Sequence, residues 1–220
     1  MTDPKRAANS RYQIVVNLTL RHEIKSVLDI GCRDCVLRDA LNDEPETMGI
    51  SYTGVDIVQN DAGTVDYIGD AAQGLPFNDG QYELVAGLDV LEHIDDFQKA
   101  LDEFERVASR CVVVALPNMA HVMFRGRFLL HGRLNSKYDL KYGYGLDRHR
   151  WLMLLPQTNR YFEAYCADRG FQLERSYLSL GGRFLPKIER VLKWLHFPES
   201  WYVFTVIYIM TKSPVEKNLA

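Results

Sequence analysis

Short apolar runs alternate with amphipathic stretches along this chain, and most of the apolar runs end in a polar residue or a glycine. Buried parallel strands have this appearance, because helices cover both faces of the sheet they form. The pattern predicts strands at 26–30, 52–56, 66–69, 84–88, 111–116, 171–178 and 201–211. Because predicted strands and helices alternate, we expect an α/β fold with a doubly wound sheet.

The predicted helices are marked by apolar residues three or four positions apart. They span 11–23, 36–42, 95–109, 158–169 and 186–196. Ser10 is a candidate N-cap for the first, and Gly170 follows the fourth, as glycine often does at helix ends. With 220 residues, 47% apolar and 25% charged, the chain fits one domain. Within 1–220 we distinguish an N-terminal tail and helix at 1–24 and an insertion at 118–156.

Four consecutive predicted strands end in acidic residues or glycine. Asp29 and Gly31 close the first, Asp56 the second, Asp70 the third, and residues 89–94 (Asp-Val-Leu-Glu-His-Ile) follow the fourth. In doubly wound sheets ligands bind beyond the carboxyl ends of the strands, so these residues indicate one shared crevice. A carboxylate accepts hydrogen bonds from two adjacent hydroxyls, and a helix after a glycine turn presents N–H groups to an anion.

These residues resemble class I S-adenosylmethionine-dependent methyltransferases of the small-molecule type. The resemblance covers residues 27–118 and includes Val-Leu-Asp-Ile-Gly at 27–31, Gly-Leu-Pro-Phe at 74–77 and Leu-Glu-His-Ile at 91–94. It implies a Rossmann-like, doubly wound, seven-stranded sheet that is mostly parallel with the last strand antiparallel, and helices on both faces. It also implies S-adenosylmethionine as cofactor and S-adenosylhomocysteine as product.

The resemblance implies a role for each acidic strand end. Asp29 would help to hold the methionyl end of the cofactor, Asp56 the ribose hydroxyls and Asp70 the adenine amine, while the backbone at Ala71 would meet the adenine ring. The remaining positions that we assign to the cofactor are Gly31, Cys32, Ile57, Asp89 and Leu91.

The glycine loop departs from the family pattern. Gly-x-Gly-x-Gly is replaced here by Gly-Cys-Arg-Asp-Cys at 31–35, so Arg33 and Cys35 carry a Cβ where the family often has none. We therefore expect the loop to bend away or to bind the cofactor less tightly, and a fold that lost its cofactor stays an alternative. Cys32 and Cys35 also raise a remote alternative, a Cys-x-x-Cys thiol–disulfide protein.

The segment 121–150 differs from the remaining chain in charge. It holds seven Lys and Arg against two Asp, a net charge of +5, although the whole chain carries −3. This asymmetry predicts a small anionic acceptor, with Asn118, Tyr142, Arg148 and Arg150 as candidate substrate-binding residues. Residues 138–145 (Tyr-Asp-Leu-Lys-Tyr-Gly-Tyr-Gly) combine tyrosines with glycines. This composition is typical of a mobile lid that excludes water.

Two further stretches are similar to the MetW-like branch associated with methionine biosynthesis. They are Leu-Pro-Asn-Met-Ala-His at 116–121 and Arg-His-Arg-Trp at 148–151, and they extend the resemblance over residues 25–180. That branch is also associated with partnering a homoserine acyltransferase. A catalytically weak or inactive regulatory or scaffolding protein is therefore the main alternative to an active enzyme, and a homodimer or a protein partner stays open.

Three histidines are candidate general bases for methyl transfer: His93, His121 and His149. A neutral imidazole near pH 7 accepts a proton from a hydroxyl or an amine, although methyl transfer mostly requires alignment of the acceptor. Glu92, His93 and His121 together are a weak candidate for a divalent metal, because adjacent residues seldom converge on one ion. We expect no metal.

Composition and apolar segments indicate compartment and partners. The net charge of −3 and pI of 6.1 disfavour a long polyanion, so nucleic acid is an unlikely partner. The longest apolar stretch, 201–210, is too short to cross a bilayer, and residues 1–20 lack a secretory signal pattern. Together with four scattered cysteines, this predicts a soluble, cytoplasmic protein without a membrane partner.

Overall fold

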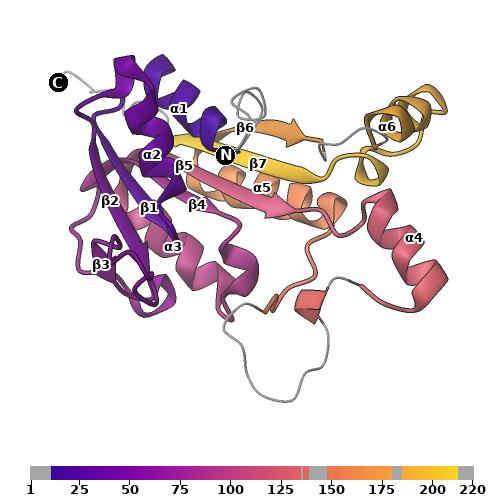
Figure 1. The fold of residues 1–220 in the computed structure, drawn as a ribbon. Coiled ribbons are helices and arrows are strands. Elements are labelled where there is room, and N and C mark those ends of the chain that lie inside the picture. The colour runs from indigo at the N-terminus through magenta and orange to yellow at the C-terminus, as the bar shows by residue number, and fades with distance from the viewer. Residues whose placement is uncertain (1–10, 135, 139–147, 180–184, 213–220) are drawn as a thin grey trace.

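Seven strands form one sheet in the order β3-β2-β1-β4-β5-β7-β6 (Figure 1). The computed structural model describes residues 11–134, 136–138, 148–179 and 185–212. The strands are β1 Ser26–Ile30, β2 Ser51–Asp56, β3 Tyr67–Ile68, β4 Tyr82–Leu88, β5 Ala108–Pro117, β6 Phe171–Leu178 and β7 Thr205–Lys212. β7 is antiparallel to β5 and β6, and the other pairs are parallel. The predicted fold class is confirmed.

Six α-helices and five short 3-10 helices connect these strands in the described residues. The α-helices are α1 Arg11–Arg21, α2 Val36–Asp43, α3 Phe97–Val107, α4 Val122–His131, α5 Leu155–Arg169 and α6 Leu185–Trp194. The 3-10 helices are η2 Pro45–Thr47, η3 Ala71–Gln73, η4 Leu91–His93, η5 Ser136–Tyr138 and η6 Glu199–Trp201. Among the described residues, no helix combines the length and apolarity needed to span a bilayer.

Helices cover both faces of the sheet (Figure 1). On one face Val15 of α1 and Leu37 of α2 belong to a buried cluster with residues of β1, β4, β5 and β7. On the other face Phe104 of α3 and Phe162 of α5 join a second cluster, in which Phe162 stacks on Tyr208 with ring centroids 4.0 Å apart. Burial of these apolar faces explains the helical spacing in the sequence.

Most elements agree with the pattern, apart from α4, which is not among the predicted helices, and the other differences between these elements and the pattern lie at their ends. α5 begins at Leu155 rather than at the predicted 158, because Pro156 occupies its first turn, where a missing N–H removes no helical bond. Gly170 closes α5 in the left-handed conformation, with φ of 71°. β7 begins at Thr205 rather than at 201, because residues 199–201 form η6. Ser10 lies outside the described residues.

The sheet order reverses direction between β1 and β4. From β1 the sheet continues through β2 to β3, whereas from β4 it continues through β5 to β7 and β6. At such a switch point the connections leave in opposite directions, and ligands bind beyond the adjacent carboxyl ends. The predicted crevice residues therefore lie on neighbouring strand ends.

The predicted insertion at 118–156 is described only in part. It contains α4, η5 and the segment 148–154, whereas Tyr142 and the glycine-containing stretch assigned to a lid lie outside the described residues. Phe124 of α4 is buried, but Phe128 and Leu129 are 57% and 84% exposed. Much of the apolar surface of α4 is therefore not packed on the core.

Candidate functional site

The loop after β1 holds three residues in the left-handed conformation. Gly31, Arg33 and Cys35 have φ of 75°, 48° and 54°. These are the positions of the three glycines in the family pattern, so the backbone keeps a glycine-like path although two side chains are present. Left-handed conformation costs a residue with a Cβ about 1–2 kcal/mol. Arg33 and Cys35 therefore accept this cost as local strain, and weaker binding of the cofactor by this loop stays a prediction.

Gly31 also meets a spatial requirement that no other residue type satisfies. A Cβ at Gly31 would lie 2.5 Å from Cγ2 of Val90, which follows β4. The N–H groups of Gly31 and Cys32 both donate to the carbonyl of Val55, at 2.8 and 3.0 Å. The turn is thereby fixed between the ends of β2 and β4.

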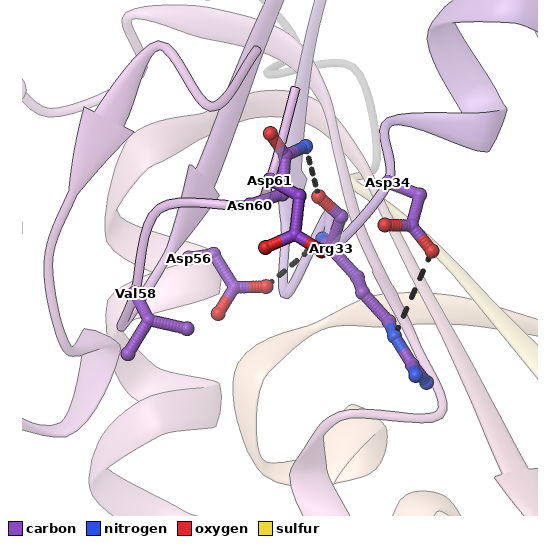
Figure 2. Close-up of a pocket in the computed structure, with 6 residues that line it drawn as sticks. All are labelled: Arg33, Asp34, Asp56, Val58, Asn60 and Asp61. Carbon is purple, nitrogen blue, oxygen red and sulfur yellow. Dashed lines mark hydrogen bonds and ion pairs between the residues drawn. The ribbon is translucent and has the colours of Figure 1, made fainter. Parts of the chain in front are cut away.

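Asp56 ends β2 beside a pocket. Its carboxylate accepts from the backbone N–H of Arg33 at 2.9 Å (Figure 2). Its other oxygen accepts from the backbone N–H of Ile57 at 2.7 Å. The pocket is lined by Arg33, Asp34, Asp56, Val58, Asn60 and Asp61. A carboxylate oxygen has two lone pairs, so each oxygen of Asp56 can accept a further hydrogen bond from a ligand. These two acceptor oxygens fit a pair of adjacent hydroxyls.

The side chain of Asn60 supports the loop that faces Asp56. Its Nδ2 donates to the carbonyl of Arg33 at 2.8 Å (Figure 2). Its Oδ1 accepts from the N–H of Thr64 at 2.9 Å. The left-handed turn at Arg33 is therefore linked to the β2–β3 connection. No sequence pattern indicated this link.

Asp29 lies inside β1 and is 4% exposed. Its Oδ2 accepts from the hydroxyl of Tyr52 at 2.8 Å. Burial raises the pKa of Asp29 to about 7, against the opposing effect of the Tyr52 hydrogen bond, and the charge of Asp56 adds to the rise. A cationic group beside Asp29 would favour the ionised form.

Asp70 and Ala71 begin η3 after β3. Asp70 accepts from the N–H of Ala72 at 2.9 Å and so caps the short helix, while Ala71 is 3% exposed. The cap leaves the second carboxylate oxygen of Asp70 for a ligand. Both residues lie beside the strand ends, and their place at the adenine end stays a prediction.

Cys32 and Cys35 form a buried pair of thiols. Their sulfur atoms lie 3.7 Å apart, and the two residues are 6% and 0% exposed. Burial and the nearby carboxylate of Asp29 raise the pKa of the Cys32 thiol. Thiol–disulfide enzymes need an accessible thiolate with a lowered pKa, so the structure opposes the redox alternative.

The end of β4 carries a half-buried aspartate with strained backbone. Asp89 has φ of 58°, and its Oδ2 forms an ion pair with Arg11 of α1 at 2.8 Å. Its Oδ1 is buried without a hydrogen-bond partner, and burial raises the pKa of Asp89. The side chain of Leu91 is fully buried in the core, so Leu91 offers only its backbone to a ligand.

Glu92, His93 and His149 come together beside this strand end. One potential ligand atom from each residue lies within 4.8 Å of the others, and the two imidazole rings make an edge-to-face contact with centroids 4.6 Å apart. Glu92 is 1% exposed, and burial together with the charge of Asp89 raises its pKa to about 8. The backbone N–H of Arg150 donates to the carbonyl of Glu92 at 2.8 Å, which joins the two segments.

His121 and Asn118 make structural contacts within the chain, and their assignment to catalysis and substrate binding stays a prediction. Nδ1 of His121 accepts from the N–H of Met123 at the start of α4, and its ring packs against Phe124 and Phe204. Asn118 is 1% exposed. Its Nδ2 donates to two carbonyls, at 2.9 and 2.7 Å, and its Oδ1 accepts from two backbone N–H groups. Its hydrogen-bonding groups already hold the end of β5.

The two arginines predicted to bind the anionic acceptor differ in their surroundings. Arg150 is exposed, and its Nε lies 3.3 Å from Asp95. Arg148 is half-buried, its Nε has no hydrogen-bond partner, and its carbonyl contacts Nδ1 of His93 at 3.0 Å. Tyr142 lies outside the described residues. Sequence reasoning missed Tyr52 and Tyr138, whose hydroxyls contact Asp29 and His149, because no motif contains them.

Comparisons with known proteins agree with this fold. Residues 6–176 match the family described as Methyltransferase domain. No curated protein matches the chain in sequence.

Three solved structures share the fold at 16% identity each. A SAM-dependent methyltransferase from Archaeoglobus fulgidus aligns with 92% of this chain and 95% of its own, with a TM-score of 0.57. The small RNA methyltransferase HEN1 aligns with 96% of this chain and 26% of its own, with a TM-score of 0.62. Magnesium protoporphyrin IX methyltransferase from Synechocystis PCC 6803, solved with bound SAH, aligns with 92% of this chain and 82% of its own, with a TM-score of 0.53.

The order of the seven strands, the antiparallel β7 and the glycine turn beside Asp56 agree with the family match, which covers more than half of the chain. The narrower similarity to the MetW-like branch has no counterpart among these matches. The chain belongs to the methyltransferase domain family, with the fold of S-adenosylmethionine-dependent methyltransferases.

Proposed function

We propose that this protein transfers a methyl group from S-adenosylmethionine to a small anionic acceptor. The observation that carries the proposal is the carboxylate of Asp56 at the end of β2, held by two backbone N–H groups at the edge of a pocket. An acid held in this way accepts from the two ribose hydroxyls of a nucleoside. Charge-assisted hydrogen bonds of this kind contribute about 1.5–3 kcal/mol.

The other cofactor positions follow from the strand ends. Asp70 and the backbone at Ala71 would contact the adenine, and the backbone at Ile57 would lie beside the ribose. The turn at Gly31 and Cys32 would contact the methionyl end, with Asp29 offsetting the charge of its ammonium group. Asp89 and the backbone of Leu91 would complete the β4 side.

The cofactor supplies a methyl group made electrophilic by the sulfonium, and the protein has to align the acceptor and exclude water. His93 and His149 are the two candidate bases that we favour, because they lie beside the end of β4, next to the β1 turn, whereas His121 caps α4. Either imidazole, when neutral, would take the proton that an acceptor hydroxyl or amine loses.

The acceptor is proposed to be anionic because residues 121–150 carry a net charge of +5. Arg148 is the stronger candidate for contact, because its half-buried guanidinium keeps a nitrogen without a hydrogen-bond partner. We expect Arg148→Ala to raise KM for an anionic acceptor about 10- to 100-fold and to leave cofactor affinity unchanged. An equal loss for the acceptor and its neutral ester would contradict the anionic contact.

A regulatory or scaffolding role, similar to that of the MetW-like branch, is the second candidate. It is favoured by the exposed apolar side chains of α4. Leu129 and Leu130 are 84% and 76% exposed and so are available to a protein partner or a second copy of the chain.

Four free, buried cysteines suit a reducing compartment such as the cytoplasm.

Calorimetric titration with S-adenosylhomocysteine tests the proposed function. We expect binding by the parent protein, and a loss of about 10- to 100-fold in affinity for Asp56→Ala. Asp61→Ala is the matched control, because it removes another carboxylate from the same pocket. Absence of binding at about millimolar ligand would overturn the catalytic proposal and favour the scaffolding role.

A further inference from the structure

Glu92 is a buried carboxyl group whose second oxygen is unsatisfied. The residue is 1% exposed, and Oε2 has no hydrogen-bond partner. Leaving such an oxygen buried and unbonded costs about 1–3 kcal/mol, and more if it is charged. Nearby, Oδ1 of Asp89 is also buried without a partner. Two unsatisfied carboxylate oxygens at one strand end indicate a ligand that supplies positive charge.

The two histidines beside Glu92 are oriented through their Nδ1 atoms. Nδ1 of His93 lies 3.0 Å from the carbonyl of Arg148, which only accepts, so Nδ1 carries the hydrogen and the lone pair of the neutral ring is on Nε2. The hydroxyl of Tyr138 donates to the carbonyl of Trp151 at 2.7 Å, and its oxygen lies 3.0 Å from Nδ1 of His149. Nδ1 of His149 is therefore the donor there, and its lone pair is also on Nε2.

This orientation is typical of metal-binding histidines, in which the N–H opposite the metal donates to a carbonyl or another oxygen. Nε2 of His149 and Oε1 of Glu92 are 4.0 Å apart, too far for a hydrogen bond. The distance is within reach of two ligands on one ion with bonds of about 2.0–2.2 Å. The potential ligand atoms of the three residues lie within 4.8 Å of one another.

We propose that Glu92, His93 and His149 bind one divalent transition-metal cation. Two imidazole nitrogens and one carboxylate suit Zn²⁺, Co²⁺, Fe²⁺ or Mn²⁺ better than Ca²⁺ or Mg²⁺, which prefer oxygen ligands. Asp89 adds negative charge beside the cluster, whereas the positive charges of Arg11 and Lys137 partly offset this negative charge. The site replaces the combination of Glu92, His93 and His121 considered from sequence, because His121 caps α4 instead.

Three protein ligands leave coordination positions for water or an acceptor oxygen. With the cation bound, the lone pairs of His93 and His149 are occupied, so the two histidines can act as bases only in the metal-free protein. If the protein is a methyltransferase as proposed above, an acceptor hydroxyl bound there would lose its proton more readily, because a divalent ion lowers the pKa of a bound oxygen. The favoured acceptor atom is then oxygen. The cation site itself depends on Glu92 and the two histidines and not on the transfer reaction.

Titration of the full-length protein with Co²⁺, followed by visible absorption and calorimetry, tests the site. We expect one Co²⁺ per chain without thiolate-to-metal charge transfer. Glu92→Gln, His93→Ala and His149→Ala should each weaken binding about 10- to 100-fold. His131→Ala, which removes an exposed histidine of α4, should bind Co²⁺ like the parent protein.

Glu92→Gln also separates the cation site from misfolding, since glutamine keeps the shape of the side chain and removes its charge. We expect this variant to unfold at or above the parent temperature and to bind S-adenosylhomocysteine as the parent does. Unchanged Co²⁺ affinity in Glu92→Gln, thiolate charge transfer from Cys32 and Cys35, or no Co²⁺ binding would each overturn the site. S-adenosylhomocysteine binding to the metal-free protein reports separately on the proposed function.

Discussion

The two halves of the crevice differ in how their polar groups are satisfied. On the β1–β2 side, Asp56 accepts one backbone hydrogen bond at each oxygen and Asp29 accepts from Tyr52. On the β4 side, Asp89 and Glu92 each keep a buried carboxylate oxygen without a partner. The first half is organised by the chain itself, whereas the second lacks a group that would complete it.

The difference teaches where strain is stored. On the β1–β2 side Arg33 and Cys35 hold left-handed backbone, and the carboxyl group of Asp29 is removed from water. On the β4 side Asp89 also holds left-handed backbone, and one carboxylate oxygen each of Asp89 and Glu92 is buried without a partner. Changes to the glycine turn should therefore alter stability through backbone and packing, and changes to the buried acids through charge.

The largest expected effect is on the glycine turn. Gly31→Ala places a Cβ 2.5 Å from Val90 in a residue with φ of 75°, so we expect a loss of about 2–4 kcal/mol in the free energy of unfolding. Urea denaturation measures this loss in the free energy of unfolding. Gly63→Ala is the control, because Gly63 has φ of 66° but no atom within 4 Å of the added Cβ, and it should lose only about 1–2 kcal/mol. Equal losses would show that packing against Val90 contributes nothing.

Asp29→Asn should stabilise the ligand-free protein in a pH-dependent way. Because the pKa of Asp29 is raised to about 7 from 3.8, the folded state binds a proton more tightly than the unfolded state, and wild-type stability falls as pH rises between these values. The asparagine variant avoids this loss. We expect a gain on the order of 2 kcal/mol at pH 8 and no gain below about pH 4.

Thermal unfolding of Asp29→Asn across this pH range measures the gain. A gain that is independent of pH would show that Asp29 is not the titrating group. Affinity for S-adenosylhomocysteine should fall in the same variant, because the carboxylate that would offset the methionyl ammonium is lost.

Arg33→Gly and Cys35→Gly restore the family glycines. Each substitution relieves left-handed strain but increases the entropy of the unfolded chain, so we expect a net change within about 1 kcal/mol. Because the backbone already follows the glycine-like path, affinity for S-adenosylhomocysteine should change less than about threefold. A tenfold gain measured by calorimetry would show that the two side chains obstruct the cofactor.

The smallest effect concerns the ion pair of Arg150 with Asp95 beside the β4 side. Both side chains are exposed, so Arg150→Ala and Asp95→Ala should each change the free energy of unfolding by less than about 1 kcal/mol. The double variant should match the sum of the single ones. A large coupling energy in this double-mutant cycle would show that the pair holds the segment 148–151 in place.

Much of the cofactor side could be predicted from sequence because its residues are local to strand ends. Asp29, Gly31, Asp56 and Asp70 each follow or close an apolar run, and the structure places the ends of those strands side by side. Their contacts with the cofactor stay predictions. Asn118 and His121 also follow a strand, but their side chains turn inward, which a linear pattern does not reveal.

The sequence by itself determined the order of strands and helices, the glycine turn and the acidic strand ends, because these depend on periodicity and on neighbours in the chain. Only the tertiary structure decided that His149 meets Glu92 and His93, that Tyr52 meets Asp29, and that Arg33 and Cys35 take left-handed backbone. Contacts between distant segments depend on the path of the connecting loops and on packing against the core, which leave no periodic signal in the sequence.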